Sequence, residues 1–345
     1  MTGHIAEVHR PRRMHLNESP LAPSPAVVAA IAAAAASANR YPEPDDPRFY
    51  ELLATYAGVD KERLAATSGS NEFLHLLPLL AEAAGAEMVV PDPSFPTYRK
   101  VAGFYDITVQ AVPVRADGVP DVDAILDAVT DRTRLVCVPS PNNPTGGLLS
   151  EEEIKRLVSG VPDSILLHFD EAYYEFGREA GGIETLPILE QRRGPWASSR
   201  SFSKAFGLAG IRLGYTIASD NELATRIRGL RPNFCVNALA WAAGSAALSD
   251  LAHVEAGLAS VAHERRRLSD GLSELGLSPL PSAANFVSFP VPPDHPDLAK
   301  AIRAAGILTT TFLMPNGTPA IRVTAGAQAD TDAFLATLAA SYGRR

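Results

Sequence analysis

The middle of the chain alternates short apolar runs with segments of helical periodicity. Apolar runs bounded by turn residues predict buried strands at residues 87–91, 107–113, 134–139, 164–170, 196–202 and 213–218. Helical spacing of apolar residues predicts helices between these strands, at residues 71–84, 121–129 and 151–159. Strands that alternate with helices pair in parallel and bury both faces. The pattern therefore predicts an α/β fold, a three-layer sandwich with a mostly parallel sheet.

The two ends of the chain have a different pattern. Ser24 and Pro25 have the character of an N-cap and a first-turn proline, and they open an alanine-rich helix that continues to about residue 39. The C-terminal third predicts two long helices and then two strands, at residues 237–248, 253–275, 285–289 and 320–324. This part has the character of a smaller α+β unit.

These elements predict three parts of the chain. Residues 1–39 form an N-terminal arm that packs with the small domain. Residues 40–230 form a large domain around the sheet, and residues 231–345 form the small C-terminal domain. In an open α/β sheet, ligands gather at the carboxyl ends of the strands. We therefore expect functional residues in the loops that follow the strands of the large domain.

Composition excludes several classes of protein. The chain has 345 residues, 46% of them hydrophobic, and a net charge of −8 without a long run of either sign, which argues against a nucleic-acid surface. We see no signal peptide and no stretch that could span a membrane. Cys137 and Cys235 lack CxxC spacing, which is typical of free thiols in a reducing cytoplasm. The histidines form no HxxH or HExxH set, so no metal site is expected.

Lys204 stands out among only five lysines. It lies in Ser201-Phe202-Ser203-Lys204-Ala205-Phe206-Gly207, between small and aromatic residues directly after a predicted buried strand. Desolvation lowers the pKa of a lysine and makes its amine a nucleophile toward aldehydes. The alternative is a lysine that extends to the surface. Arg212, eight residues later, is a permanent cation near two hydroxyls, which suits a phosphate.

Three other loops carry candidate residues, each with a structural alternative. Asp170 ends an apolar strand, so its carboxylate needs a buried cation or caps the next segment. Asn143 lies in a turn rich in asparagine, proline and glycine, which is also ordinary turn chemistry. Ser70 and Asn71 open a helix whose N-terminus attracts anions, although a capping motif explains them equally well. A GxGxxG fingerprint is absent, which counts against a nicotinamide enzyme.

Together these loops resemble the fold-type I enzymes that use pyridoxal 5'-phosphate (PLP), in particular class I/II aminotransferases, and most closely histidinol-phosphate aminotransferases. The resemblance covers essentially the whole chain. It rests on Leu16-Asn17-Glu18-Ser19-Pro20, Arg40-Tyr41-Pro42, Gly69-Ser70-Asn71-Glu72, Pro93-Ser94-Phe95, Asn143-Pro144-Thr145-Gly146, Asp170-Glu171-Ala172-Tyr173, residues 201–214, Ala284-Asn285-Phe286-Val287 and Ile321-Arg322-Val323-Thr324.

The resemblance implies how the cofactor is held. Lys204 forms a Schiff base with PLP and moves the proton at the substrate Cα, while Asp170 pairs with the ring nitrogen. Asn143 and Tyr173 bind the phenolate oxygen, and Phe95 stacks on the ring. The residues implied around the phosphate are Ser70, Asn71, Ser201, Ser203 and Arg212.

The resemblance also implies partners and substrates. Tyr41 reaches the phosphate of the neighbouring subunit, so a homodimer with shared active sites is expected. Arg322 clamps the substrate α-carboxylate in a bidentate manner, and Asn17 contributes to substrate binding. The substrates are a small amino donor and a 2-oxo acid acceptor.

One segment departs from the family pattern. Histidinol-phosphate aminotransferases usually carry an arginine shortly after a Gly-Val or Gly-Ile pair, which here is Gly306-Ile307. This chain has Thr309-Thr310-Thr311 at that place, and no lysine or arginine occurs between Gly306 and Arg322. The arm also lacks the family's usual tyrosine. It has Arg10, Arg12 and Arg13, which either replace the missing cation or face solvent. We therefore expect a neutral, aromatic or specialised substrate rather than histidinol phosphate.

Three functional hypotheses follow. The first is an aminotransferase, because the cofactor set is complete and accompanied by a carboxylate clamp. The second is a PLP-dependent decarboxylase, oxidase or lyase, since the same scaffold supports these reactions. The third is a cofactor-binding module without catalysis, which the short N-terminal segment disfavours because no DNA-binding extension precedes residue 16.

Overall fold

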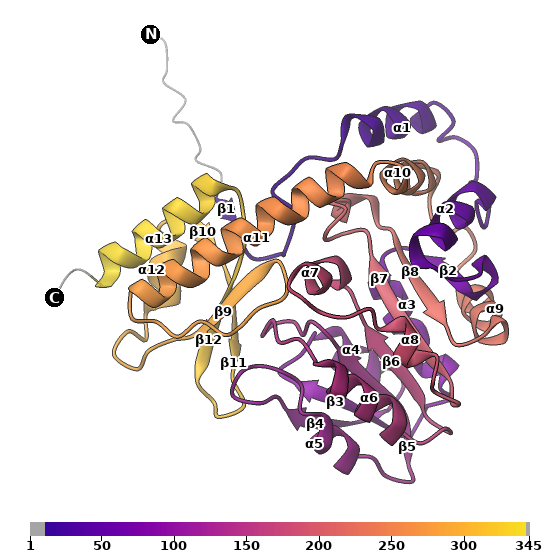
Figure 1. Cartoon of the computed structure of the whole chain (residues 1–345), viewed down its shortest axis with the longest axis horizontal. Helices are drawn as coiled ribbons and strands as arrows, with labels where there is room; N and C mark the ends of the chain where they lie inside the picture. Colours follow the sequence, from indigo (N-terminus) through magenta and orange to yellow (C-terminus); the bar gives the residue numbers. More distant parts are fainter. Residues whose placement is uncertain (1–10, 343–345) are drawn as a thin grey trace.

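The structure is a computed structural model that describes residues 11–342, and its main unit is a seven-stranded sheet (Figure 1). In spatial order the strands are β2 (Leu64–Thr67), β8 (Gly214–Ala218), β7 (Trp196–Ser201), β6 (Leu166–Asp170), β5 (Thr133–Pro139), β3 (Glu87–Asp92) and β4 (Thr108–Pro113). All neighbours pair in parallel except β8, which is antiparallel to both β7 and β2. The predicted α/β fold with a mostly parallel sheet is confirmed.

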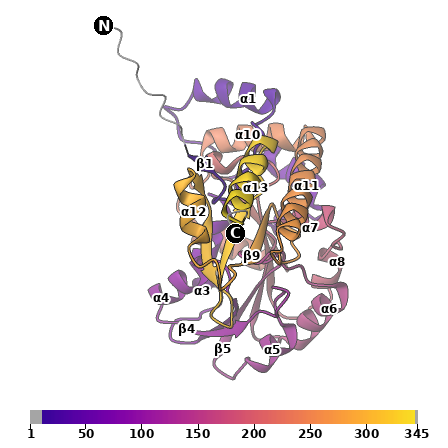
Figure 2. The same ribbon diagram turned by 90° about the vertical axis from the view of Figure 1, so that its left-hand side faces the viewer.

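Helices cover both faces of this sheet, as Figure 2 shows. One face carries α3 (Ser70–Leu80), α4 (Thr97–Phe104) and α9 (Asn221–Leu230). The other carries α5 (Val122–Asp127), α6 (Glu151–Gly160), α7 (Tyr174–Glu179) and α8 (Leu186–Leu189). Successive side chains of a strand point to opposite faces, so in β6 Leu166 packs in one core and Leu167 in the other. Two buried faces explain why the strands read as continuous apolar runs.

The C-terminal part forms a second, smaller unit. Its antiparallel sheet has the order β11 (Thr310–Leu313), β12 (Pro319–Thr324) and β9 (Phe286–Pro290). The 24-residue helix α11 (Leu251–Glu274) runs from α10 (Ala238–Leu248) toward this unit, where it packs on α13 (Gln328–Tyr342), which also contacts α12 (Leu298–Ala304) (Figure 1). Within residues 11–342, no helix combines the length and the apolar character that crossing a bilayer requires.

The N-terminal segment joins both units. Its short strand β1 (Arg12–Arg13) pairs in parallel with β10 (Ile307–Leu308), and the next residue, Met14, is buried. Helix α1 (Pro25–Ala35) lies on α10. Between these two anchors the chain passes Lys204, so the segment is placed to contribute to a site. The predicted domain boundaries after residues 39 and 230 stay a prediction.

The periodicity located most elements and missed others. The first helix ends at Ala35 rather than near residue 39, because the serine, alanine and asparagine that follow form turns instead of a further helical turn. Three elements without a predicted counterpart bear on the site, namely β2, α4 and β11. A 3₁₀ turn, Lys61–Arg63, precedes β2, and helix α2 (Pro47–Ala57), also unpredicted, begins at the N-cap Asp46, whose side chain accepts a hydrogen bond from Phe49 N.

Close helix packing makes Gly244 of α10 a sensitive position. A Cβ there would lie 2.5 Å from Leu213 Cδ2 and 2.6 Å from Phe49 Cε2. Gly244→Ala should lower the free energy of unfolding by about 1–3 kcal/mol, since overpacking outweighs the better helix propensity of alanine. Urea unfolding followed by circular dichroism measures the change.

Gly229 of α9 is the matched control, because a Cβ there would have no heavy atom within 4 Å. Gly229→Ala should leave stability unchanged or raise it by about 0.5–1 kcal/mol. Equal stabilisation by both substitutions would show that Gly244 is not tightly packed.

Candidate active site

The carboxyl edge of the large sheet gathers the predicted residues. Phe95, Asn143, Asp170 and Lys204 follow the carboxyl ends of the parallel strands β3, β5, β6 and β7. Strand β8 runs in the opposite direction, so its beginning, next to Arg212, lies at the same edge. Ser70 follows the end of β2 at this edge. Topology alone therefore brings together residues far apart in the sequence.

The amine of Lys204 is enclosed, and its pKa is lower than that of an exposed lysine. Its Nζ donates hydrogen bonds to Leu16 O at 3.1 Å and Asn17 O at 3.0 Å, and it lies 5.8 Å from the centre of the Tyr173 ring. Burial, followed by the positive charge of Arg322, lowers the pKa of Lys204 to about 8. An amine with this pKa has a substantial unprotonated fraction near neutral pH, which makes it a nucleophile.

Asn17 connects the arm to the rest of the site. Its backbone has a φ of 54°, a left-handed conformation that asparagine tolerates better than most residues. Asn17 Nδ2 donates to the Tyr173 hydroxyl at 2.8 Å, and Thr324 Oγ1 donates to Asn17 Oδ1 at 3.0 Å. Its carbonyl accepts from Lys204 and, at 3.0 Å, from Asn285 Nδ2. Asn17 is therefore the residue on which the arm, the sheet edge and the small unit meet.

Asp170 is a buried carboxylate with several donors. Its Oδ2 accepts a hydrogen bond from the Tyr98 hydroxyl at 2.5 Å, and its Oδ1 accepts one from Ala172 N at 3.0 Å. Burial raises the pKa of Asp170, while the hydrogen bonds from Tyr98, Ala172 and Ser199 oppose that rise. A buried carboxyl group that already accepts these hydrogen bonds suits a cationic partner.

Arg322 lies on β12, opposite Thr310 of β11. Its Nη1 donates to Asn143 Oδ1, and its Nη2 donates to His15 O at 2.6 Å and to Thr310 Oγ1 at 3.1 Å. Its Nε is buried and has no hydrogen-bond partner among the described residues. Because guanidinium has five N–H donors, Arg322 is held in place and retains donors for an anion.

The start of helix α3 and Arg212 form a candidate anion site. Gly69 precedes the helix with a φ of 79°, and a Cβ there would lie 2.5 Å from Arg212 Nη2. A Cβ at Gly214 would lie 2.3 Å from Ser70 N. Glycine at position 69 thus leaves room for the guanidinium beside the helix N-terminus, and glycine at position 214 lets the start of β8 lie against the same N-terminus. Backbone N–H groups and the helix dipole favour an anion at this place.

Side-chain hydroxyls and an amide complete this anion site. Arg212 Nη1 donates to Ala209 O at 2.9 Å and approaches Ser203 Oγ at 3.5 Å. Ser203 N donates to Ser201 Oγ at 3.0 Å, and both serines are buried. The Oδ1 atom of Asn71 is buried without a partner among the described residues. The serine hydroxyls and the Arg212 guanidinium provide donors for the oxygens of a phosphate, whereas Asn71 Oδ1 is an acceptor.

Two predicted aromatic residues differ in their placement. Phe95 is half-buried, and its ring lies edge-on to that of Tyr98, with 6.5 Å between centroids, so it belongs to the Asp170 side of the site. Tyr41 is 83% exposed and stacks on Phe234 at 4.7 Å. Within one chain, none of the described contacts of Tyr41 reaches the cluster around Lys204.

The arginines of the arm have acidic partners. Arg12 pairs with Asp330 at 2.6 Å and Arg13 with Glu18 at 2.7 Å, and both guanidinium side chains remain largely exposed. Arg10 lies outside the described residues. Glu18 is near enough to Lys204 to raise its pKa, against the effect of burial. Arg13 therefore borders the site through Glu18.

Sequence reasoning did not single out Tyr98 and His15, and it named Thr310 only as part of the segment Thr309-Thr310-Thr311, without its contact to Arg322. Tyr98 lies three positions after Phe95, and its N–H donates to Phe95 O at 3.2 Å in the turn that leads into α4, a helix that the sequence pattern did not predict. The carbonyl of His15 accepts hydrogen bonds from both Arg322 and Thr310. These two contacts depend on the β11–β12 register and on the path of the arm, which local patterns do not reveal.

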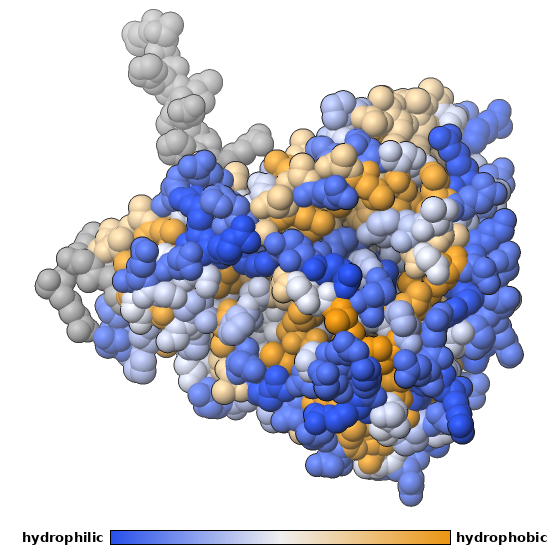
Figure 3. Space-filling model, in the orientation of Figure 1, coloured by the Kyte–Doolittle hydropathy of each residue, from blue (hydrophilic) through white to orange (hydrophobic). Residues whose placement is uncertain are grey.

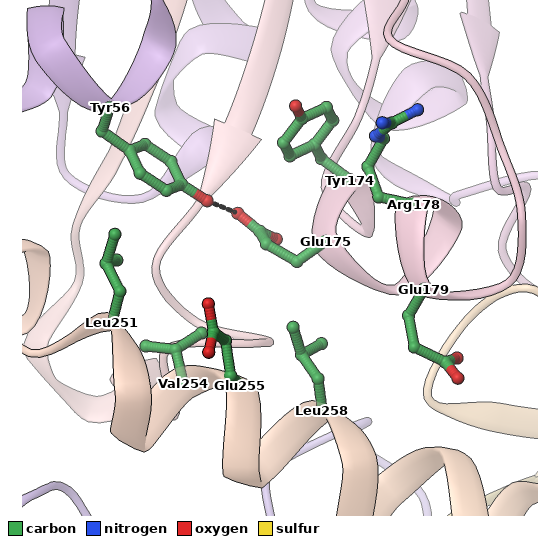
Figure 4. Close-up of a pocket in the computed structure, with 9 residues that line it drawn as sticks. All are labelled: Tyr56, Tyr174, Glu175, Arg178, Glu179, Leu251, Val254, Glu255 and Leu258. Atoms are coloured by element: carbon green, nitrogen blue, oxygen red, sulfur yellow. Dashed lines mark hydrogen bonds between the residues drawn. The ribbon is translucent and has the colours of Figure 1, made fainter.

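A different cavity lies between α7 and the beginning of α11, with a volume of about 320 Å³ (Figure 4). It is lined by residues that include Tyr56, Glu175 and Leu258. The Tyr56 hydroxyl donates to Glu175 Oε1 at 3.0 Å, and burial raises the pKa of Glu175 to about 7. None of the predicted site residues lines this cavity. The surface in Figure 3 shows apolar residues exposed around the same region.

Comparison with known proteins gives consistent matches over nearly the full length. The model of the family Aminotransferase class I and II matches residues 13–338. A protein named aromatic amino acid aminotransferase from Rhodococcus jostii is 40% identical, over 95% of this chain and 89% of its own length. Histidinol-phosphate aminotransferase 1 of Mesorhizobium japonicum is 32% identical, over 93% and 88%.

The fold also matches solved structures. Histidinol-phosphate aminotransferase from Sinorhizobium meliloti, in complex with pyridoxal-5'-phosphate, superposes with a TM-score of 0.88 and 29% identity, covering 97% of this chain and 91% of that one. A Thermus thermophilus aspartate aminotransferase mutant, at 22% identity and a TM-score of 0.84 over 99% of both chains, shares the fold.

The low pKa of Lys204 predicts a distinct pH profile for its reactivity. In dialysed protein free of small molecules, labelling of Lys204 by a small aldehyde and cyanoborohydride should be half-maximal near pH 8, well below the pKa near 10.4 typical of exposed lysines. Peptide mass spectrometry follows the modification.

Two variants give opposite shifts. Arg322→Ala removes a positive charge and should move the midpoint to higher pH, whereas Glu18→Gln removes a negative charge and should move it to lower pH. A midpoint near 10 in the unmodified protein would contradict the enclosed amine.

Proposed function

The chain belongs to the class I and II aminotransferases, and we propose that it uses PLP held by Lys204 to transfer an amino group from an aromatic amino acid to a 2-oxo acid. The observation that carries this proposal is the pair formed by the enclosed amine of Lys204, whose pKa is lowered to about 8, and the buried carboxyl group of Asp170, which accepts hydrogen bonds from Tyr98 and Ala172. Membership of the family supports amino-group transfer rather than decarboxylation, oxidation or elimination.

The residues present fit the cofactor at each of its functional groups. Lys204 would hold the aldehyde carbon, and Asp170 would pair with the ring nitrogen. The Ser70 helix start and Arg212 would bind the phosphate, since the absence of a side chain at Gly69 leaves the Arg212 guanidinium next to the N-terminus of α3. Bound PLP supplies an electron sink for negative charge at the substrate Cα. The relative from Sinorhizobium meliloti binds the same compound in its structure.

The remaining roles are proposed from the contacts described above. Lys204 Nζ takes and returns the proton at the substrate Cα, because its pKa near 8 allows both directions near neutral pH. Arg322 binds the substrate α-carboxylate with donors that its contacts to Asn143 and Thr310 do not use. Tyr173 and Asn143 would hold the ring oxygen of PLP, and Phe95 would cover its ring. Asn17 orients Tyr173 beside the substrate.

The neutral side chain of Thr310 beside Arg322 supports an aromatic substrate rather than one with a second negative charge. Thr310 lies opposite Arg322 on β11, where its hydroxyl serves the guanidinium rather than a second anion. A phosphorylated or dicarboxylic substrate needs a further cation to offset the cost of burying its second charge. The relatives named aromatic amino acid aminotransferases, at 36–40% identity, support this choice.

Free thiols support the cytoplasm as the compartment. Cys137 is buried and Cys235 partly buried, and both are free. Thiols persist in reducing compartments, where structural disulfides are rare.

A donor panel tests the substrate. With a common 2-oxo acid acceptor, kcat/KM for phenylalanine or tyrosine should exceed that for histidinol phosphate by about tenfold or more, since one missing charge-assisted contact is equivalent to about 1.5–3 kcal/mol. Chromatography with mass detection of the products gives the rates.

Two variants at one position separate charge from orientation. Thr310→Val removes only the hydroxyl that holds Arg322, so it should reduce kcat/KM for all α-carboxylate donors alike. Thr310→Arg adds a cation and should shift the preference toward histidinol phosphate. A wild-type protein that prefers histidinol phosphate would refute the aromatic assignment.

We also propose a homodimer with shared active sites, in which Tyr41 of each subunit reaches the phosphate bound by the other. Tyr41 and Phe234 together expose large aromatic surface, at 83% and 42%, which is typical of a contact region. Free protein surfaces rarely carry two such rings side by side.

Sedimentation equilibrium should give a mass of about twice 36.6 kDa. Tyr41→Phe keeps the ring but removes the hydroxyl, so the dimer should persist while PLP affinity falls about tenfold or more. A monomeric wild-type protein, or unchanged affinity in this variant, would contradict the shared site.

A further inference from the structure

Tyr98 is a buried phenol whose hydroxyl has one described partner, the Asp170 carboxylate. It is the second residue of α4, only 2% of its surface is exposed, and its hydroxyl lies 2.5 Å from Asp170 Oδ2. A hydrogen bond to a charged acceptor is shorter and stronger than one between neutral groups. Tyr98 therefore bears directly on the charge at the end of β6.

The strand geometry explains this contact. Side chains alternate along β6, so Asp170 faces the same layer as Leu166 and His168, and α3 and α4 cover that layer. The Tyr98 ring lies 6.1 Å from the His168 ring and 6.5 Å, edge-on, from that of Phe95. Packing on both sides fixes the direction of the phenol.

The other neighbours of Asp170 leave a specific role for this phenol. Ala172 N donates to Oδ1, and Ser199 lies near the carboxylate with its Oγ 2.9 Å from His168 Nε2. Burial lowers the pKa of His168 to about 3, so the imidazole is neutral and adds no positive charge. The thiol of Cys137 also lies close, and proximity to Asp170 helps to raise its pKa. The Tyr98 hydroxyl donates to Oδ2 at 2.5 Å, on the oxygen that Ala172 N does not contact.

We propose that Tyr98 is a positioning residue that holds Asp170 in one orientation, with its charge retained, so that the carboxylate is ready for the protonated ring nitrogen of the cofactor. This inference rests on the proposed function, because it concerns the same PLP site. Tyr98 acts through Asp170 and needs no contact with cofactor or substrate. Its effect on the cofactor must therefore depend on the ring nitrogen.

That dependence gives a test that a merely structural role would fail. In the apoenzyme, the dissociation constants of PLP and of its carbocyclic analogue, in which C–H replaces the ring nitrogen, are measured by fluorescence titration. Tyr98→Phe should weaken PLP by about tenfold or more and leave the analogue within about threefold, as expected for the loss of a hydrogen bond to a charged group. A purely structural role would weaken both ligands equally.

A double-mutant cycle checks that the effect passes through Asp170. In the Asp170→Asn background, Tyr98→Phe should change neither dissociation constant by more than about threefold, since the charge that it supports is absent. With the loaded enzymes, Tyr98→Phe should lower kcat by about 10- to 100-fold and leave the KM of the amino donor nearly unchanged. A PLP-to-analogue ratio equal to that of the wild type would overturn the proposal.

Two controls complete the design. Tyr50→Phe removes another buried phenol that donates to an aspartate, Asp45 at 2.7 Å, outside the proposed site, and it should leave the ratio of dissociation constants unchanged. Tyr98→His keeps a ring donor, and should give a ratio between those of the wild type and Tyr98→Phe. If Tyr98→Phe does not fold, Tyr98→His and Asp170→Asn are compared with the wild type. A ratio of the PLP and analogue dissociation constants equal to that of the wild type in both variants would overturn the proposal.

The proposed function is tested separately in the same samples. Borohydride reduction of the wild-type holoenzyme should leave the cofactor covalently attached to Lys204, as peptide mass spectrometry detects. Absence of that label would refute the PLP role of Lys204. Its presence with an unchanged ratio in Tyr98→Phe would refute only the role of Tyr98.

Discussion

Exclusion of water from two groups of opposite charge is the constraint on which this site depends. Burial disfavours the charged form of each group, so it lowers the pKa of Lys204 and raises that of Asp170. The amine is useful when neutral, and the carboxylate is useful when ionised. The charge of Arg322 lowers the pKa of Lys204 further, whereas hydrogen bonds oppose the rise in the pKa of Asp170. Lys204 contacts two backbone carbonyls, whereas Asp170 receives donors from Tyr98, Ala172 and Ser199.

Segments from both ends of the chain complete the environment of these groups. The arm supplies the carbonyls of Leu16 and Asn17, and the small sheet supplies Arg322. Arg322 in turn donates to the carbonyl of His15, so the arm and β12 stabilise each other's position. The strand pairing between β1 and β10 anchors the arm just before it enters the site. The carboxyl edge of the large sheet therefore forms one side of the site, and the N-terminal arm and the small sheet enclose the other side.

Much of this arrangement could be predicted from the sequence for physical reasons. Strands buried on both faces leave uninterrupted apolar runs, so six of the seven strands of the large sheet were located by their pattern. Lys204 and Asp170 were identified because a charged side chain at the end of such a run is unusual. The individual roles came from family resemblance, and the identification of the family is confirmed. The assignment of individual site residues remains a prediction.

What the sequence did not reveal depends on packing between distant segments. In the sequence Tyr98 is an ordinary aromatic residue. Its importance becomes visible only when the structure shows that its hydroxyl donates to Asp170. The contact between Thr310 and Arg322 depends on the β11–β12 register, which places the two residues opposite each other. Strand β2 is only four residues long, too short for a clear pattern. Local periodicity predicts which residues are buried, but it does not predict which buried residues contact one another.

The reversed direction of β8 has a consequence for how the site can vary. Because β7 and β8 are antiparallel, residues 202–213 leave the sheet and return to the same edge, closed by a hydrogen bond from Phe202 N to Leu213 O at 3.1 Å. The nucleophilic amine and the guanidinium of the anion site are thus two points on one closed loop. An insertion or deletion between them would alter their separation without any change in either residue. The length of this loop, as well as its composition, therefore determines how far apart the amine and the guanidinium lie.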